Sequence, residues 1–179
     1  PDFSRINMYG GLMNEYHKEE IKIYDSYYIP DSSFDDQLDL HVLFNDFDID
    51  FANVFLPEDV LSNFSGQLKG LLKTDGNWVE PMLNGNVKLN NGEIKLNEFN
   101  TDYSFNGNLV FKPDEITINQ IPIYDKLNSE GELSAFFVHD NFTNYSYNII
   151  GIFSEPFMVM NTEYEMNPLY YGDAYVTGF

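Results

Sequence analysis

The middle of the chain alternates strictly between apolar and polar side chains. Segments 87–90 and 94–97 place Val, Leu or Ile at every second position, with Lys and Asn between them. A period of two is typical of β-strands that have one covered face and one wet face. Parallel strands covered on both faces would instead read as unbroken apolar runs. The pattern therefore predicts antiparallel strands.

The same alternation continues toward the C-terminus, through residues 105–111, 116–123, 133–137 and 147–153. Pro113-Asp114 supplies a turn between the first two of these segments, because Pro and Asp favour tight turns. The fold class predicted from this pattern is all-β.

Turn signals suggest how the strands are connected. Asn91-Gly92 predicts a tight hairpin turn, because both residue types tolerate positive φ. Five glycines also recur at intervals of 22, 24, 20 and 21 residues, namely Gly85, Gly107, Gly131, Gly151 and Gly172. The interval suits a repeated hairpin of two strands, and it equally suits glycines that merely mark strand ends and bulges.

One segment departs from the β pattern. Its apolar residues recur at helical spacing and are Phe51, Val54, Phe55, Val60, Leu61 and Phe64. Pro57, followed by two acidic residues, resembles a helix start, and Gly66 suits a helix stop. We predict a short amphipathic helix over 57–64, preceded by one turn from 51, that packs on the sheet.

Charge narrows the range of partners. The 179 residues carry 29 acidic and 9 basic side chains, a net charge of −20. The net charge is −11 over residues 1–63, −2 over 64–126 and −7 over 127–179, where no Lys or Arg occurs. Such a chain is poorly suited to nucleic acid and to anionic bilayer surfaces.

The sequence contains no recognisable catalytic or metal-binding motif. The absence of Cys excludes disulfides and thiol chemistry. His17, His41 and His139 lie far apart in sequence. The run Asp46-x-Asp48-x-Asp50 opens like a calcium loop, but Phe51 replaces its essential Gly. We expect no enzyme activity, no metal and no cofactor. No apolar stretch reaches the ~20 residues of a transmembrane helix, and we expect the chain to be a fragment of a longer protein.

Several glycine-containing motifs follow one another in a characteristic order. They are G-Q-L-K-G at 66–70, G-N-W-V-E-P at 76–81, G-N-V-K-L-N-N-G-E-I at 85–94, F-N-G-N-L at 105–109 and Y-Y-G-D-A-Y-V-T-G at 170–178. This succession resembles the C-terminal region of the TamB family, which belongs to the AsmA-like group. The resemblance covers 64–179, whereas 1–63 shares only the strand alternation. Trp78 departs from the smaller aliphatic residue usual in the family.

The resemblance implies a long antiparallel sheet curled into a U-shaped groove, a β-taco, whose concave face is apolar. It implies a periplasmic segment of a protein anchored in the inner membrane of a Gram-negative bacterium. Such a protein carries phospholipid between the inner and outer membranes. It also supports outer-membrane protein assembly with a TamA-like barrel partner. We expect a single elongated domain over 1–179, with acidic strands and the helix in 1–63 and the TamB-like groove in 64–179.

The expected groove lining follows from the alternation, and the expected ligand is the acyl chain of a phospholipid. The lining side chains are Val87, Leu89, Ile94, Leu96, Phe105, Leu109, Phe111, Ile116, Ile118, Ile121, Ile123 and Leu133. Three alternatives remain open. The same side chains could fill a closed β-sandwich, the chain could be a structural module that docks to a partner through its strand edges, or exposed Trp78 could help a β-sandwich to bind carbohydrate.

Overall fold

The structure is a computed structural model, and it describes residues 5–30, 37–55, 61–140, 143–161 and 169–178. All ten strands in these residues belong to one antiparallel sheet, in which each strand pairs with its neighbours in the chain. The strands are β1 (Ile6–Met13), β2 (Glu19–Ile29), β3 (Gln37–Asp48), β4 (Leu61–Gly76), β5 (Pro81–Leu96), β6 (Thr101–Lys112), β7 (Glu115–Asp125), β8 (Glu130–Asp140), β9 (Thr143–Met158) and β10 (Leu169–Gly178).

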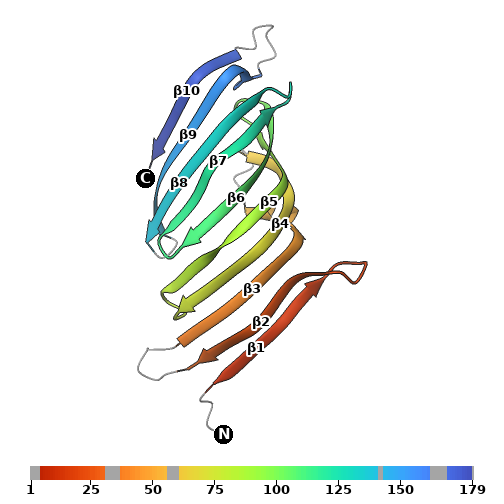
Figure 1. The fold of residues 1–179 in the computed structure, drawn as a ribbon, viewed down its shortest axis with the longest axis vertical. Helices are drawn as coiled ribbons and strands as arrows, with labels where there is room; N and C mark the ends of the chain where they lie inside the picture. The colour runs from red at the N-terminus through yellow and green to blue at the C-terminus, as the bar shows by residue number, and fades with distance from the viewer. Residues whose placement is uncertain (1–4, 31–36, 56–60, 141–142, 162–168, 179) are drawn as a thin grey trace.

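The sheet is an open meander whose two edges are β1 and β10 (Figure 1). The predicted all-β class is confirmed. The closed β-sandwich alternative is wrong, because the described strands form no second sheet. The described sheet is neither closed nor strongly curled, so only the coarser prediction of one long antiparallel sheet is confirmed.

Asn91-Gly92 does not form the predicted hairpin turn. Strand β5 runs through this pair to Leu96, and its pairing with β6 slips between Leu89 and Gly92. Asn91 adopts φ of 50°, and its N–H donates a hydrogen bond to the side-chain oxygen of Asn106 in β6 at 2.8 Å. The left-handed conformation that suits a tight turn equally suits a β-bulge. The sequence therefore correctly indicated positive φ at Asn91, but the predicted hairpin turn is wrong.

Similar bulges interrupt four other strands. Asp25, Asp46, Asn63 and Gln120 have positive φ at or beside register shifts in β2, β3, β4 and β7. Each bulge bends its strand and increases the local twist. A sheet with strands of up to 16 residues can therefore stay twisted and open.

The predicted helix over 57–64 is wrong in its second half. Residues 56–60 lie outside the described part of the chain, and strand β4 begins at Leu61, which pairs with Leu96. A six-residue 3₁₀ helix, η1 (Asp50–Phe55), lies where one helical turn was expected. The Asn53 side chain holds it to β4 through both backbone groups of Phe64, at 2.6 and 2.8 Å. Backbone pairing in β4 thus overrides the helical spacing.

The glycine period does not mark two-stranded units. Gly85 and Gly107 lie in adjacent strands, and so do Gly131 and Gly151. The interval from Gly107 to Gly131 includes all of β7, whereas the other three intervals lead into the next strand, so the glycines mark no constant unit.

Candidate functional site

One face of the sheet is apolar from edge to edge, and it is called the apolar face below. Cross-strand pairing aligns side chains from all ten strands into rows that run across the sheet. The first row is Leu12, Ile21, Phe44, Gly70, Val87, Leu109, Ile118, Ala135, Ile149 and Val176. At a strand spacing of 4.7–4.9 Å, such a row is about 43 Å long.

A second row runs beside the first, two positions along each strand. Its members are Gly10, Ile23, Val42, Leu72, Gly85, Phe111, Ile116, Phe137, Tyr147 and Gly178. Neither row contains a charged side chain. The apolar face is therefore continuous in both directions, along the strands and across them.

All twelve side chains predicted to line a groove lie on this face. Leu89, Ile121 and Leu133 belong to a third row, and Phe105 pairs with Ile123 in a fourth. Val87, Leu89 and Ile121 are 1%, 3% and 5% exposed, because the side chains of neighbouring rows cover them. The other nine are half-buried. Their predicted contact with lipid stays a prediction.

Glycines make room for the large side chains of the apolar face. A methyl group at Gly107 would lie 2.6 Å from the Ile121 side chain, and one at Gly131 would lie 2.5 Å from the Phe153 ring. The large side chain beside each glycine can therefore lie flat over the backbone. This spacing explains why glycines recur on the apolar side of the strands.

The opposite face carries the charges. Lys69 pairs directly with Lys88 across β4 and β5, and Asn108 of β6 continues the row. Asp46 accepts a hydrogen bond from Lys18 at 2.8 Å and lies 3.7 Å from Lys69. The hydrogen bond from Lys18 holds the pKa of the Asp46 carboxyl below its usual value.

The incomplete calcium-loop sequence does not gather its carboxylates. Asp46 is engaged by lysines, whereas the Asp50 N–H donates to the Asp48 carboxylate at 3.1 Å. Burial, followed by the hydrogen bond to Asp48, raises the pKa of Asp50. Among the residues that the structure describes, no cluster of His, Asp or Glu side chains could hold a metal ion.

The three histidines also lie in separate places. His17 lies in the β1–β2 turn, and the backbone of His139 donates to the Asp114 carbonyl at the end of β8. The His41 ring lies 2.9 Å from Asp39 on the polar face, and Lys73 lies 3.9 Å from the same carboxylate oxygen. These contacts tie β3 to β4.

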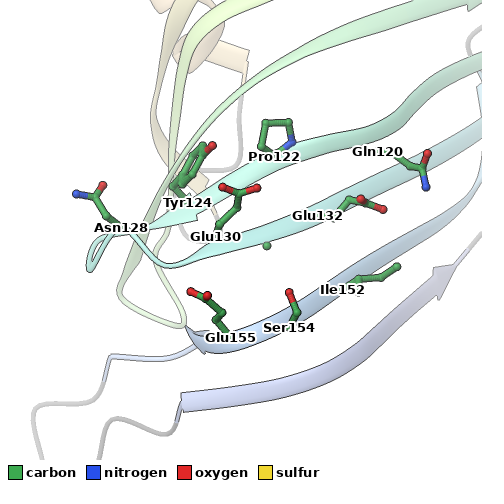
Figure 2. A pocket seen from close by; sticks show the side chains of 10 residues that line it. Gln120, Pro122, Tyr124, Asn128, Glu130, Glu132, Ile152, Ser154 and Glu155 are labelled. Carbon is green, nitrogen blue, oxygen red and sulfur yellow. The ribbon is translucent and has the colours of Figure 1, made fainter.

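A hollow of 730 Å³ lies on the polar face of β7, β8 and β9. Figure 2 shows Tyr124, Glu130 and Glu155 around it, on three neighbouring strands. Loss of solvation raises the pKa of the Tyr124 hydroxyl, and the nearby Glu130 adds to the effect. The hollow is acidic and polar, and it lacks the apolar lining of a typical small-molecule pocket.

At one end of the sheet, the chain itself covers the apolar face. Residues Phe157–Asn161, called the strap below, are the last two residues of β9, which still pair with Tyr170 and Leu169 of β10, and the three residues that follow them. The Phe157 ring stacks on Tyr103 of β6 with centroids 5.7 Å apart. Three strand spacings in a flat sheet would separate β6 from β9 by about 14 Å. The strap therefore folds over the sheet, and Phe157 is 1% exposed.

Besides the pairing with β10, several hydrogen bonds hold the strap, among them one from the Asn100 side chain to the Asn161 carbonyl at 3.2 Å. The Met158 N–H donates to the Asp125 carboxylate at 2.7 Å, and the Tyr103 hydroxyl donates to the Met158 carbonyl at 3.1 Å. Farther along, the Asn161 N–H donates to the Phe99 carbonyl at 2.8 Å. Burial raises the pKa of the Tyr103 hydroxyl, so this group stays protonated as a donor.

Sequence reasoning missed the strap and its contacts. Tyr103 and Phe153 fit the strand alternation but were not among the predicted lining residues, and Phe157 lies beyond the last regular segment. Pro156 was the one available signal, because Pro interrupts a strand ladder. Nothing in the sequence indicates how far across the sheet the chain then travels.

Trp78 lies in the β4–β5 turn at the opposite end of the strands. It is 57% exposed, and its ring centroid lies 5.8 Å from that of Tyr28, whose β3 partner is Leu38 on the apolar face. No described segment is a helix long and apolar enough to cross a membrane.

No family model, curated protein or solved structure matches the chain. The resemblance to the TamB family therefore rests on the sequence motifs alone.

Proposed function

We propose that this chain is a segment of a periplasmic, TamB-like protein, and that its apolar face carries the acyl chains of phospholipids between the inner and outer membranes. The observation that carries the proposal is the pair of uncharged rows that run from β1 to β10 in a single layer. A soluble domain usually buries such a surface beneath a second layer of structure.

The rows suit an acyl chain in both chemistry and length. Each methylene group that leaves water contributes about 0.8 kcal/mol. A row about 43 Å long accommodates an extended chain without fixing its position, because neighbouring row members are similar in polarity. In the proposal, the chain is one part of a longer sheet that curls further into a U-shaped groove, and the whole protein is anchored in the inner membrane.

The charges of the polar face support an orientation in which this face meets water. Along each strand, apolar-face residues alternate with polar ones such as Lys69, Lys88 and Asn108. This alternation alone places charged side chains on one face and apolar side chains on the other. The proposal assigns no catalysis, metal or cofactor to the chain. Its partners are phospholipid and a TamA-like outer-membrane barrel protein, with which the whole protein supports outer-membrane protein assembly.

Photo-crosslinking at adjacent positions of β6 tests the proposal. Leu109 points to the apolar face and Val110 to the opposite face, and both are half-buried. A photoreactive amino acid at position 109 should crosslink to phospholipid in cells that make the protein, whereas the same group at 110 should not. Mass spectrometry identifies the adduct.

Two results would contradict the proposal. Crosslinks to lipid at equal yield from both positions would indicate nonspecific contact, and no lipid at 109 would remove the assigned function. Because the two positions are neighbours in one strand, expression and local folding are matched.

Docking to a partner through a strand edge is a second candidate function. Strand β10 pairs only with β9 in the described sheet, and its Tyr175 and Val176 are 65% and 53% exposed. A free strand edge can bind an extended segment of another protein by β-augmentation. Crosslinks from position 175 to an outer-membrane barrel, together with no lipid crosslink at 109, would favour this candidate. The remaining alternative, carbohydrate binding at Trp78, would be supported by hits in a glycan screen.

A further inference from the structure

The β4–β5 turn presents apolar side chains to solvent. Trp78 and Val79 form the tip of the turn and are 57% and 79% exposed. Met82, the second residue of β5, is 45% exposed. Three exposed apolar side chains thus gather within five residues at the end of one hairpin.

Hydrogen bonds hold this turn in one conformation. The Asn77 side-chain oxygen accepts the N–H groups of Val79 and Glu80 at 2.8 and 2.7 Å. Gly76 has φ of 97°, and a methyl group there would lie 2.6 Å from the Glu80 carbonyl oxygen. The exposed side chains therefore stand on a preorganised backbone, and a contact made through them costs little ordering entropy.

The tip of the turn adjoins the apolar face. Tyr28 of β2 pairs with Leu38 of β3, which pairs with Gly76 of β4. The Trp78 ring lies 5.8 Å from the Tyr28 ring, on the far side of β3 from the strand that Trp78 follows. The indole therefore reaches along the end of the apolar face while half of it stays in water. Trp favours the boundary between a bilayer and water, because it combines a large apolar ring with a polar N–H.

The charges beside the turn are acidic. A hollow of 620 Å³ lies next to it, and its lining includes the carboxylates Glu80, Asp114 and Asp140 together with Pro81 and Met82. These carboxylates repel an anionic bilayer surface. They complement the ammonium group that ends a zwitterionic phospholipid headgroup. The apolar tip and the acidic surroundings together suit a bilayer surface without net charge.

We propose that the β4–β5 turn is a membrane-contact site that inserts Trp78 and Val79 into the headgroup region of a zwitterionic phospholipid bilayer. The contact site goes beyond the proposed transport of acyl chains, and it can exist without that function. In this arrangement the turn brings one end of the apolar face to the bilayer surface.

Fluorescence of the unmodified 179-residue chain tests the proposal, because Trp78 is its only tryptophan. Vesicles of phosphatidylcholine should shift the emission to shorter wavelength, and phosphatidylcholine brominated in its acyl chains should quench it. Vesicles made mostly of phosphatidylglycerol should bind at least about fivefold more weakly, because their headgroups and the carboxylates beside the turn carry the same charge.

A matched pair of variants separates the turn from the rest of the surface. Val79→Asp should weaken binding to phosphatidylcholine vesicles by roughly tenfold or more in a flotation assay, because it replaces an apolar contact with a charge. Val54→Asp makes the same change at a valine that is 83% exposed in η1, at the other end of β4. This control should bind vesicles as well as the unmodified chain does.

Every other outcome overturns the contact site. Unchanged emission with phosphatidylcholine, tighter binding to phosphatidylglycerol, or equal loss of binding in both variants would each contradict it. Self-association that Val79→Asp abolishes, without any binding to vesicles, would instead assign the tip to contacts between copies of this chain.

Lipid crosslinks at Leu109 report separately on the proposed function. If they persist while vesicles leave the Trp78 emission unchanged, only the contact site is overturned. If they are absent while Val79→Asp abolishes binding to vesicles, only the proposed function is overturned.

Discussion

At the scale of single residues, buried polar groups in this sheet hold backbone segments in place. Asp125 is 4% exposed, and its carboxylate accepts three backbone N–H groups, from Leu127, Ser129 and Met158, at 2.7 to 2.9 Å. The first two shape the β7–β8 turn, and the third fastens the strap. The Asp125 carboxylate thus links the β7–β8 turn to the end of β9.

Replacing this carboxylate should therefore destabilise the fold. We expect Asp125→Ala to lower the free energy of unfolding by about 3 kcal/mol, because it leaves buried N–H groups without an acceptor. Urea denaturation measures the change. Asp102→Ala, an exposed carboxylate of β6, is the matched control and should change stability by no more than about 0.5 kcal/mol. Equal effects of the two variants would contradict the role given to Asp125.

The Lys18–Asp46 pair makes a prediction about pH. The folded pKa of Asp46 lies below its ordinary value, chiefly because of the hydrogen bond from Lys18. The pair therefore stabilises the fold above the ordinary pKa of an aspartate, and this contribution is lost as the pH falls through the folded pKa. Carboxyl-detected NMR titration should show a low midpoint for Asp46, and Lys18→Ala should raise it. An unchanged midpoint in the variant would assign the shift to another cause.

At the scale of elements, bulges decide where a strand bends and which face its side chains reach. A residue inserted at a bulge lets the alternation slip by one position without moving apolar side chains to the wet face. In β5, Asn91 is this residue, so Leu89 and Ile94 lie on the same face although five positions separate them.

This account of β5 predicts opposite effects for two substitutions at one position. Asn91→Val should destabilise the protein by about 1–2 kcal/mol, because a β-branched residue is strained at φ of 50°. Asn91→Gly should be close to neutral, since glycine adopts this φ freely. Thermal unfolding compares the two. A tolerated valine would show that the backbone at 91 does not depend on the left-handed conformation.

The elements also show how far the sequence alone could predict the structure. Alternation correctly assigned the faces of strands β5 to β8, because the side-chain period is fixed by the backbone. It did not distinguish a bulge from a turn at Asn91-Gly92, since both use the same conformation. The helical spacing around Leu61 was overridden by pairing with Leu96. The strap depends on contacts between residues more than 50 positions apart, for which no local pattern exists.

At the scale of the whole molecule, the sheet separates charge from apolar surface by its two faces. A net charge of −20 favours solubility, although one face is apolar from β1 to β10. Close packing inside one layer buries the central side chains Val87 and Leu89, whereas Leu12 and Val176 at the two edges are 57% and 53% exposed. The apolar face is therefore most accessible at the ends of its rows.

An apolar face without a second layer should bind an apolar dye in the folded state. Nile red is uncharged, so the acidic surface does not repel it, and its fluorescence should rise with the native protein at full near-ultraviolet circular dichroism. That second signal excludes a molten globule, which also binds dyes. The neighbouring residues Ile149 and Ile150 provide a matched pair, because Ile149 lies in the first row and Ile150 on the opposite face. Ile149→Asn should weaken dye binding, and Ile150→Asn should leave it unchanged. Loss of binding in both variants, or in neither, would contradict the assignment of the dye to the apolar face.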